Sequence, residues 1–198
     1  MENDVKEYME QLIEQLNSID YIRSEDIPNI DLYMYQITTF MDSQLEACKR
    51  YEDDKILTKT MINNYAKNDL LPPPIKKKYS KEHLLLLVFI YYFKNLLTIT
   101  DIQSLLKPIT DKYFQGSDQL TLEDIYNEVF RLEKSQIDVL KEDIVNRYQL
   151  SRETFSDAPE EDQEFLKTFS FICLLSFDVY IKKQIIEKLI DQMNPPKK

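Results

Sequence analysis

The side chains that most often carry out chemistry are few and scattered in this sequence. His83 is the only histidine, and it stands at the expected start of a helix with no ligand partner at metal-binding spacing. Cys48 and Cys173 form no C-x-x-C pair, and each lies in an apolar pattern where cysteine packs as a small hydrophobic residue. Acidic residues cluster in turn-like segments such as Asp53-Asp54 and residues 160–162, where solvation is expected. The sequence therefore favours a protein that is not an enzyme and that has no metal or cofactor.

Composition indicates an all-α fold. The 198 residues include one glycine, Gly116, and no tryptophan, whereas β-hairpins usually draw on glycine-containing turns. The same scarcity excludes phosphate-binding loops and dinucleotide fingerprints, which need several glycines. The longest apolar runs, Leu84 to Phe93 and Phe169 to Phe177, are shorter than the roughly 20 residues that a membrane span requires. We expect a cytoplasmic protein with reduced thiols and no membrane partner.

Helical periodicity predicts where the elements lie. Apolar spacing and capping residues predict seven helices, at about 5–16, from Asp31, from Thr58 to Leu70, from Lys81 to Asn95, from Thr98 to Pro108, after Thr121 and over 164–193. The helix from Asp31 has one face formed by Tyr33, Ile37, Phe40, Met41, Leu45 and Cys48. The helix after Thr121 is expected to point Leu122, Ile125, Val129, Leu132, Val139 and Ile144 inward. The run Leu84 to Phe93 is apolar around its whole circumference, so it must be buried. We expect the first helix, the aromatic last helix or a second copy to cover it, in one compact body.

One lysine-rich segment interrupts this acidic chain, whose formal charge is −10. Lys76, Lys77 and Lys78 follow the stiff Pro72 to Pro74 segment, and their charges are suited to phosphate oxygens. The preceding short helix carries polar side chains such as Asn63 and Asn64, whose amides can pair with adenine edges. Three adjacent lysines are also compatible with a simple solvated turn.

The string LTKTMINNYAKNDLLPPPIKKKYSKEHLLLLVFIYYFKNLLTITDIQSLL resembles the winged helix-turn-helix of MerR-type regulators. The shared features are a recognition helix, a Leu70-Leu71-Pro72 exit, a basic wing and two further helices. The resemblance implies a DNA-reading surface with the recognition helix at Thr58–Leu70 and the wing at Lys76–Tyr79. The residues it assigns to DNA are Thr58, Lys59, Thr60, Asn63, Asn64, Tyr65, Lys67, Lys76, Lys77, Lys78 and Tyr79.

The chain departs from the MerR pattern in two places. Asn63-Asn64-Tyr65 stands where that family carries an Arg-Tyr-Tyr run, and the glycine before its last head helix is absent. The segments IPNIDLYMYQITTFM and DKILTKTMINNYAKNDLLPPP also resemble a bacterial family known only as a domain of unknown function. The expected organisation is an N-terminal helix and connector at 1–30, the winged helix-turn-helix at 31–107 and a C-terminal helical region at 108–198.

These observations leave two functional hypotheses. The first is a transcriptional regulator that binds double-stranded DNA as a homodimer and senses an unassigned small-molecule effector, for which the many aromatic residues could line a pocket. The second keeps the helix-turn-helix but makes it a protein-interaction module without DNA binding, as the net charge and the missing arginine suggest.

Overall fold

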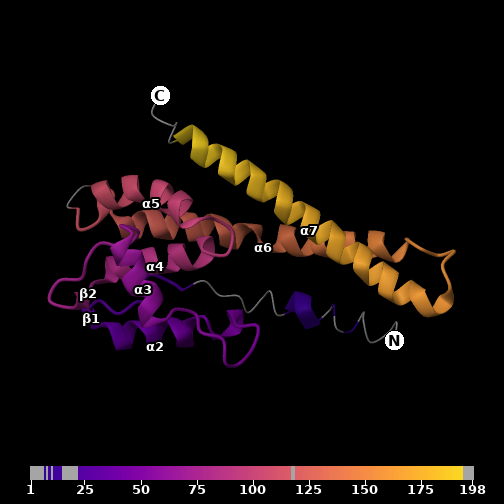
Figure 1. The fold of residues 1–198 in the computed structure, drawn as a ribbon, viewed down its shortest axis with the longest axis horizontal. Helices are drawn as coiled ribbons and strands as arrows, with labels where there is room; N and C mark the ends of the chain where they lie inside the picture. Colours follow the sequence, from indigo (N-terminus) through magenta and orange to yellow (C-terminus); the bar gives the residue numbers. More distant parts are fainter. Residues whose placement is uncertain (1–6, 8, 10, 15–21, 117–118, 194–198) are drawn as a thin grey trace. The chain divides into compact units, whose positions relative to one another are not determined.

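The computed structural model describes residues 7, 9, 11–14, 22–116 and 119–193, which group into two compact units (Figure 1). The head unit contains the described residues of 21–131 and 189–198, and the hairpin unit contains those of 1–20 and 132–188. The sequence predicted one compact body, in which the helix-turn-helix region ends at residue 107 and the C-terminal helical region begins at residue 108. Both of these residues lie inside one continuous helix.

The described chain is mostly helical, as its composition predicted. Its elements are β1 (Leu32–Tyr33), α2 (Met34–Gln44), the short 3-10 helix η1 (Glu46–Cys48), α3 (Lys59–Lys67), β2 (Lys78–Tyr79), α4 (Lys81–Phe93), α5 (Ile99–Tyr113), α6 (Leu122–Arg152) and α7 (Glu160–Met193). β1 and β2 pair antiparallel, with Leu32 opposite Tyr79 and Tyr33 opposite Lys78. This pairing explains why α2 begins at Met34 and not at Asp31.

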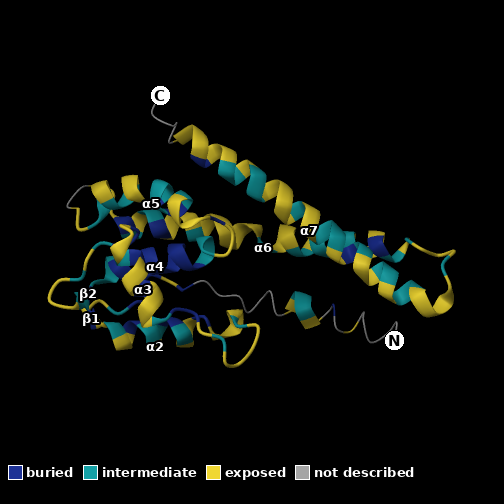
Figure 2. Cartoon of the chain, viewed as in Figure 1, coloured by how far each residue is buried: buried dark blue, intermediate teal, exposed yellow. Residues whose placement is uncertain are grey.

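Helix α4 forms the core of the head unit (Figure 2). Every residue from His83 to Tyr91 is buried, which confirms the inference drawn from its all-round apolar sequence. Aromatic side chains of α6 cover one side, because the ring of Phe89 lies 5.5 Å from that of Tyr126 and 5.7 Å from that of Phe130. The first turns of α6 therefore supply cover that the sequence assigned to the first and last helices.

The inward face of α6 differs from the expected one. Leu122 and Tyr126 are buried, but Val129, Leu132 and Val139 are exposed. Tyr126 also donates a hydrogen bond from its hydroxyl to the carbonyl oxygen of Ile22, which fastens the start of the head unit to α6. Of the aliphatic residues predicted to point inward, Leu122 is buried and Ile125 and Ile144 are half-buried, so the prediction is confirmed only in part.

Side-chain caps begin several helices where the sequence placed them. Thr98 and Asp101 form a reciprocal capping box at α5. Thr121 and Asp124 form another at the start of α6. Pro108 was expected to end α5 but lies inside it. A proline in a helix removes one amide donor at a cost of roughly 3 kcal/mol, so the burial of neighbouring α5 residues must offset that loss.

The hairpin unit consists mainly of the later part of α6 and most of α7, which run antiparallel. Tyr148 packs edge-on against Phe171 at 5.5 Å, and Arg152 forms an ion pair with Glu164 at 2.8 Å. The expected start of the last helix at Glu164 is wrong by one turn, because α7 begins at Glu160. Of the expected first helix, residues 7, 9 and 11–14 are helical and the others lie outside the described residues. No described helix combines the length and apolarity needed to cross a membrane.

His83 closes the first turn of α4 from inside the core. Its side chain is nearly inaccessible, and its Nδ1 accepts a hydrogen bond from the Ser80 amide at 2.9 Å. The ring packs edge-on against Tyr79 at 5.3 Å and against Phe114 at 4.8 Å. Because Nδ1 acts as an acceptor, this cap requires the neutral imidazole. The predicted position of His83 at the start of a helix is therefore confirmed, and the residue also packs in the core of the head unit.

We expect acid to destabilise the head unit through His83. Burial lowers the pKa of His83 below its ordinary 6.5, although the carbonyl groups of Pro72 and Pro73 and the charge of Glu82 act in the opposite direction. The unfolded chain then binds a proton more readily than the folded chain. Unfolding free energy should therefore fall as the pH drops from 7 through 6.5 toward the folded pKa, by up to about 1.4 kcal/mol per pH unit for one proton.

The matched variant is His83→Gln, whose side chain offers an acceptor to the Ser80 amide but does not titrate in this range. Urea denaturation from pH 7.5 to 5 should show a steeper loss of stability for the unmodified chain than for the variant. Equal pH dependence of the two proteins would contradict this role of His83.

Candidate nucleic-acid interface

Helix α3 is short because both of its ends are tied by local hydrogen bonds. The Thr58 hydroxyl accepts from the Met61 amide at 3.2 Å, as an N-cap does. After the helix, Asp69 adopts a positive φ of 54°, and the Leu70 amide donates to the Tyr65 carbonyl at 2.9 Å. This is the Schellman arrangement, and it ends α3 at Lys67, three residues before the expected Leu70.

The two faces of α3 divide the predicted site residues. Ile62 and Tyr65 are buried against the head unit. The opposite face presents polar side chains to solvent, and these are Lys59, Thr60, Asn63, Asn64 and Lys67. This exposed set can offer amide donors, amide acceptors and two cations to a ligand. Those are the groups that contact base edges and phosphates in DNA-binding helices.

The lysine segment forms a tight hairpin turn and not a straight arm. The Lys78 amide donates to the Ile75 carbonyl at 2.9 Å, and the Ile75 amide donates to the Lys78 carbonyl at 3.1 Å. The two central residues have positive φ, 50° at Lys76 and 65° at Lys77. Two consecutive positive φ values define a type I′ turn, which normally uses Asn-Gly. The turn places the side chains of Lys76 and Lys77 in solvent.

Lysine is an unfavourable residue at both of these positions. A non-glycine residue held at positive φ costs on the order of 1–3 kcal/mol, and such strain is concentrated at functional sites. The chain therefore keeps two cations where asparagine and glycine would be more stable.

Two tyrosines that the sequence did not assign to the site lie beside it. The Lys59 ammonium lies 5.7 Å from the centroid of the Tyr35 ring, and the Lys78 ammonium lies 5.4 Å from that of Tyr33. Both tyrosines are more than half exposed at the start of α2, so the inward position expected for Tyr33 is wrong. The start of α2 thus contacts both α3 and the turn. The sequence feature that could have indicated these two residues is the alternation of tyrosine with other residues in the segment LYMYQ.

Three of the predicted contact residues do not present free side chains on this surface. Tyr65 and Tyr79 are buried, and burial raises the pKa of both phenols. The Thr58 hydroxyl is occupied as the helix cap. We call the remaining set, together with the two tyrosines, the basic surface, and it comprises Tyr33, Tyr35, Lys59, Thr60, Asn63, Asn64, Lys67, Lys76, Lys77 and Lys78.

Positive charge is concentrated around this surface. Residues 55–81 contain seven lysines and one aspartate, a net charge of +6 in a chain of net charge −10. Lys81 forms an ion pair with Glu123 at 2.8 Å, whereas Lys76 and Lys77 are exposed to solvent. The acidic total therefore conceals a basic region, which is the footprint that phosphate binding requires.

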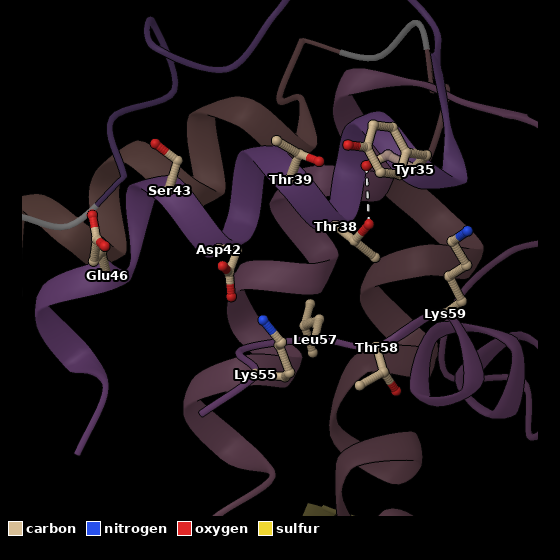
Figure 3. A pocket seen from close by; sticks show the side chains of 10 residues that line it. All are labelled: Tyr35, Thr38, Thr39, Asp42, Ser43, Glu46, Lys55, Leu57, Thr58 and Lys59. Carbon is tan, nitrogen blue, oxygen red and sulfur yellow. Dashed lines mark hydrogen bonds between the residues drawn. The ribbon is translucent and has the colours of Figure 1, made fainter. Parts of the chain in front are cut away.

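A polar groove borders the start of α3 (Figure 3). It has a volume of about 590 Å³ and lies between α2 and residues 55–59. Asp42 and Lys55 point toward one another across it in Figure 3. The Lys49 ammonium, 2.9 Å from Asp42, lowers the pKa of that carboxyl group, so Asp42 stays ionised. With Glu46 it makes one wall acidic, in contrast to the basic surface.

The cysteines and carboxylates form no metal centre among the residues that the structure describes. No group of three histidine, cysteine or acidic side chains in that part of the chain is arranged to hold a metal ion. Cys48 is exposed in η1, so its expected packing role is wrong, because α2 ends before it. Cys173 is half-buried in α7.

We expect the double variant Lys76→Asn/Lys77→Gly to be more stable than the natural chain. Asparagine and glycine accept positive φ, so the type I′ turn should gain about 1–2 kcal/mol of unfolding free energy. Chemical denaturation measures the change. Lys67→Asn is the matched control, because it removes a lysine from an ordinary helical position and should give no gain. A loss of stability in the double variant would contradict the strained turn.

Comparison with known proteins gives a family but no activity. No curated protein matches the chain, and no solved structure matches it. The model of a family described as Domain of unknown function (DUF1836) matches residues 22–129, which covers more than half of the chain and includes every residue of the basic surface. The chain belongs to this family of unknown function.

Proposed function

We propose that the head unit is a winged helix-turn-helix that binds double-stranded DNA and that the protein regulates transcription. In this proposal α3 is the recognition helix and enters the major groove. The type I′ turn at residues 75–78 is the wing and contacts the phosphate backbone. The observation that carries the proposal is the pair of strained, exposed lysines at the tip of this turn, next to the exposed polar face of α3.

The order of elements supports this proposal. A short strand precedes α2, a connector leads to α3, and the turn returns the chain to β2, which pairs with that first strand. Two further helices follow. The order matches the MerR-like resemblance of the sequence, although the connector between α2 and α3 is long and contains η1. Asn63 and Asn64 would take the position of the residues that read base edges.

Binding to a pool of mixed-sequence DNA duplexes, measured by fluorescence anisotropy over a range of salt concentrations, tests the proposal. Each lysine–phosphate contact adds about −0.9 to the slope of log affinity against log salt. We expect measurable binding at low salt with a clear negative slope. The Lys76→Asn/Lys77→Gly variant should bind more weakly and lose roughly two from the slope, although its fold is at least as stable.

Two controls separate the contributions. Lys134→Asn removes an exposed lysine of α6 outside the basic surface and should leave affinity and slope unchanged. Asn63→Ala/Asn64→Ala should reduce discrimination among sequences by about 1–3 kcal/mol per lost base contact while the salt slope stays the same. No binding at low salt, or binding without a salt slope, would overturn the proposal.

A second candidate is a protein-interaction module with the same fold. The acidic wall of the groove, formed by Asp42 and Glu46 beside the start of α3, favours it because carboxylates there repel phosphate. The variant with Lys76, Lys77 and Lys78 changed to glutamate distinguishes the two functions in a pull-down. Retention of a protein partner in that variant, with no DNA binding by either chain, would support the interaction module.

A further inference from the structure

Helix α7 carries a row of exposed side chains with regular spacing. Phe165, Phe169, Ile172, Ser176 and Val179 follow one another at intervals of four, three, four and three residues, and all are exposed. Each of the four apolar members is at least half exposed, and Phe165 reaches 71%. We call this row the α7 seam. The intervals are those of a coiled-coil interface, in which side chains of one helix pack between those of another.

The α7 seam faces away from the other helix of the hairpin unit. Residues seven apart on α7 contact α6, since Glu164 pairs with Arg152 and Phe171 packs on Tyr148. Asp178, a further seven residues on, lies 3.4 Å from Arg147. These contacts define one face of α7, and the seam occupies a different face. Hence α6 does not cover the seam.

We infer that a second copy of this chain covers the α7 seam, with the two α7 helices packed antiparallel about a two-fold axis near its middle. The four exposed apolar side chains of the seam would bury roughly 400–500 Å² per chain. The side chains that flank the seam must supply the remainder of the roughly 800 Å² per partner of a standard stable interface. A two-fold axis satisfies both seams at once, because the same surface is used by each copy. The interface does not depend on the proposed DNA binding.

Charge at the two ends of the seam selects the antiparallel orientation. Acidic residues precede the seam, and after it in α7 three lysines outnumber the two acidic residues Glu187 and Asp191. The acidic set is Glu160, Glu161 and Asp162, and the lysines are Lys182, Lys183 and Lys188. An antiparallel pair places the acidic end of each helix beside the basic end of its partner, whereas a parallel pair would place like charges together.

The ion pairs that two of these lysines form within α7 are weak enough for carboxylates of a partner chain to replace them. Lys182 bridges to Asp178 at 2.8 Å, and Lys183 lies 3.7 Å from Glu187, in each case within the same helix. Such exposed pairs one turn apart contribute little to stability. Carboxylates of a partner chain can therefore bind these lysines at little cost in lost ion pairs within the helix.

The oligomeric state of the full chain tests the inference. Sedimentation velocity and light scattering should give twice the 23.7 kDa mass of one chain at micromolar concentration. Phe169→Glu/Ile172→Glu should give a monomer with unchanged helical circular dichroism. Val139→Glu is the matched control, because Val139 is 59% exposed on α6 outside the seam, and this variant should remain a dimer. A natural chain that is monomeric at all concentrations would overturn the inference.

A charge exchange tests the orientation. Lys182→Glu/Lys183→Glu and Glu161→Lys/Asp162→Lys should each weaken self-association by about tenfold or more at low salt. The two variants mixed together should form a mixed dimer more stable than either variant alone, because opposite charges then meet at both ends of the seam. Unchanged self-association of the two separate variants would contradict the antiparallel arrangement, because a parallel pair has like charges together at both ends with or without these changes. Dimerisation that survives Phe169→Glu/Ile172→Glu would place the interface elsewhere.

Discussion

Burial of a helix without a polar face is the constraint on which the head unit depends. Each leucine of α4 that leaves water contributes about 1.5–3 kcal/mol, but only if other elements surround it on every side. Side chains of α6 pack on Phe89, and Phe114 at the end of α5 packs on His83. The same burial lowers the pKa of His83, which packs against Tyr79 next to the lysine turn. Buried packing, more than contacts at the surface, therefore positions the turn and the neighbouring helix α3.

The basic surface is built against local conformational preference. Lys76 and Lys77 occupy a turn that favours asparagine and glycine, and Asp69 occupies the left-handed position at the end of α3 where glycine is usual. A chain with a well-filled core can tolerate such costs, because the surrounding packing determines the backbone. Of the five described residues with positive φ, three lie in this region beside the concentration of lysines, and the other two are Gln115 and Phe155.

The sequence was sufficient for the features governed by local rules. The all-α class, the burial of α4, the capping residues Thr58, Thr98 and Thr121, and the exposure of Asn63 and Asn64 follow from composition, periodicity and capping chemistry. Features set by tertiary contacts were missed. β2 pairs with β1, and Tyr79 of the predicted wing is buried. Aromatic packing placed Tyr126 inward on α6 where Val129 was expected.

The central claim is that the basic surface of the head unit is where DNA binds. Backbone amide chemical shifts, recorded by NMR while a short duplex is added at low salt, test it residue by residue. We expect the shifts to change at residues 33–35, 58–67 and 75–78 and to stay constant in the hairpin unit over residues 140–180. Unchanged shifts in the first set, or changes confined to the hairpin unit, would contradict the account.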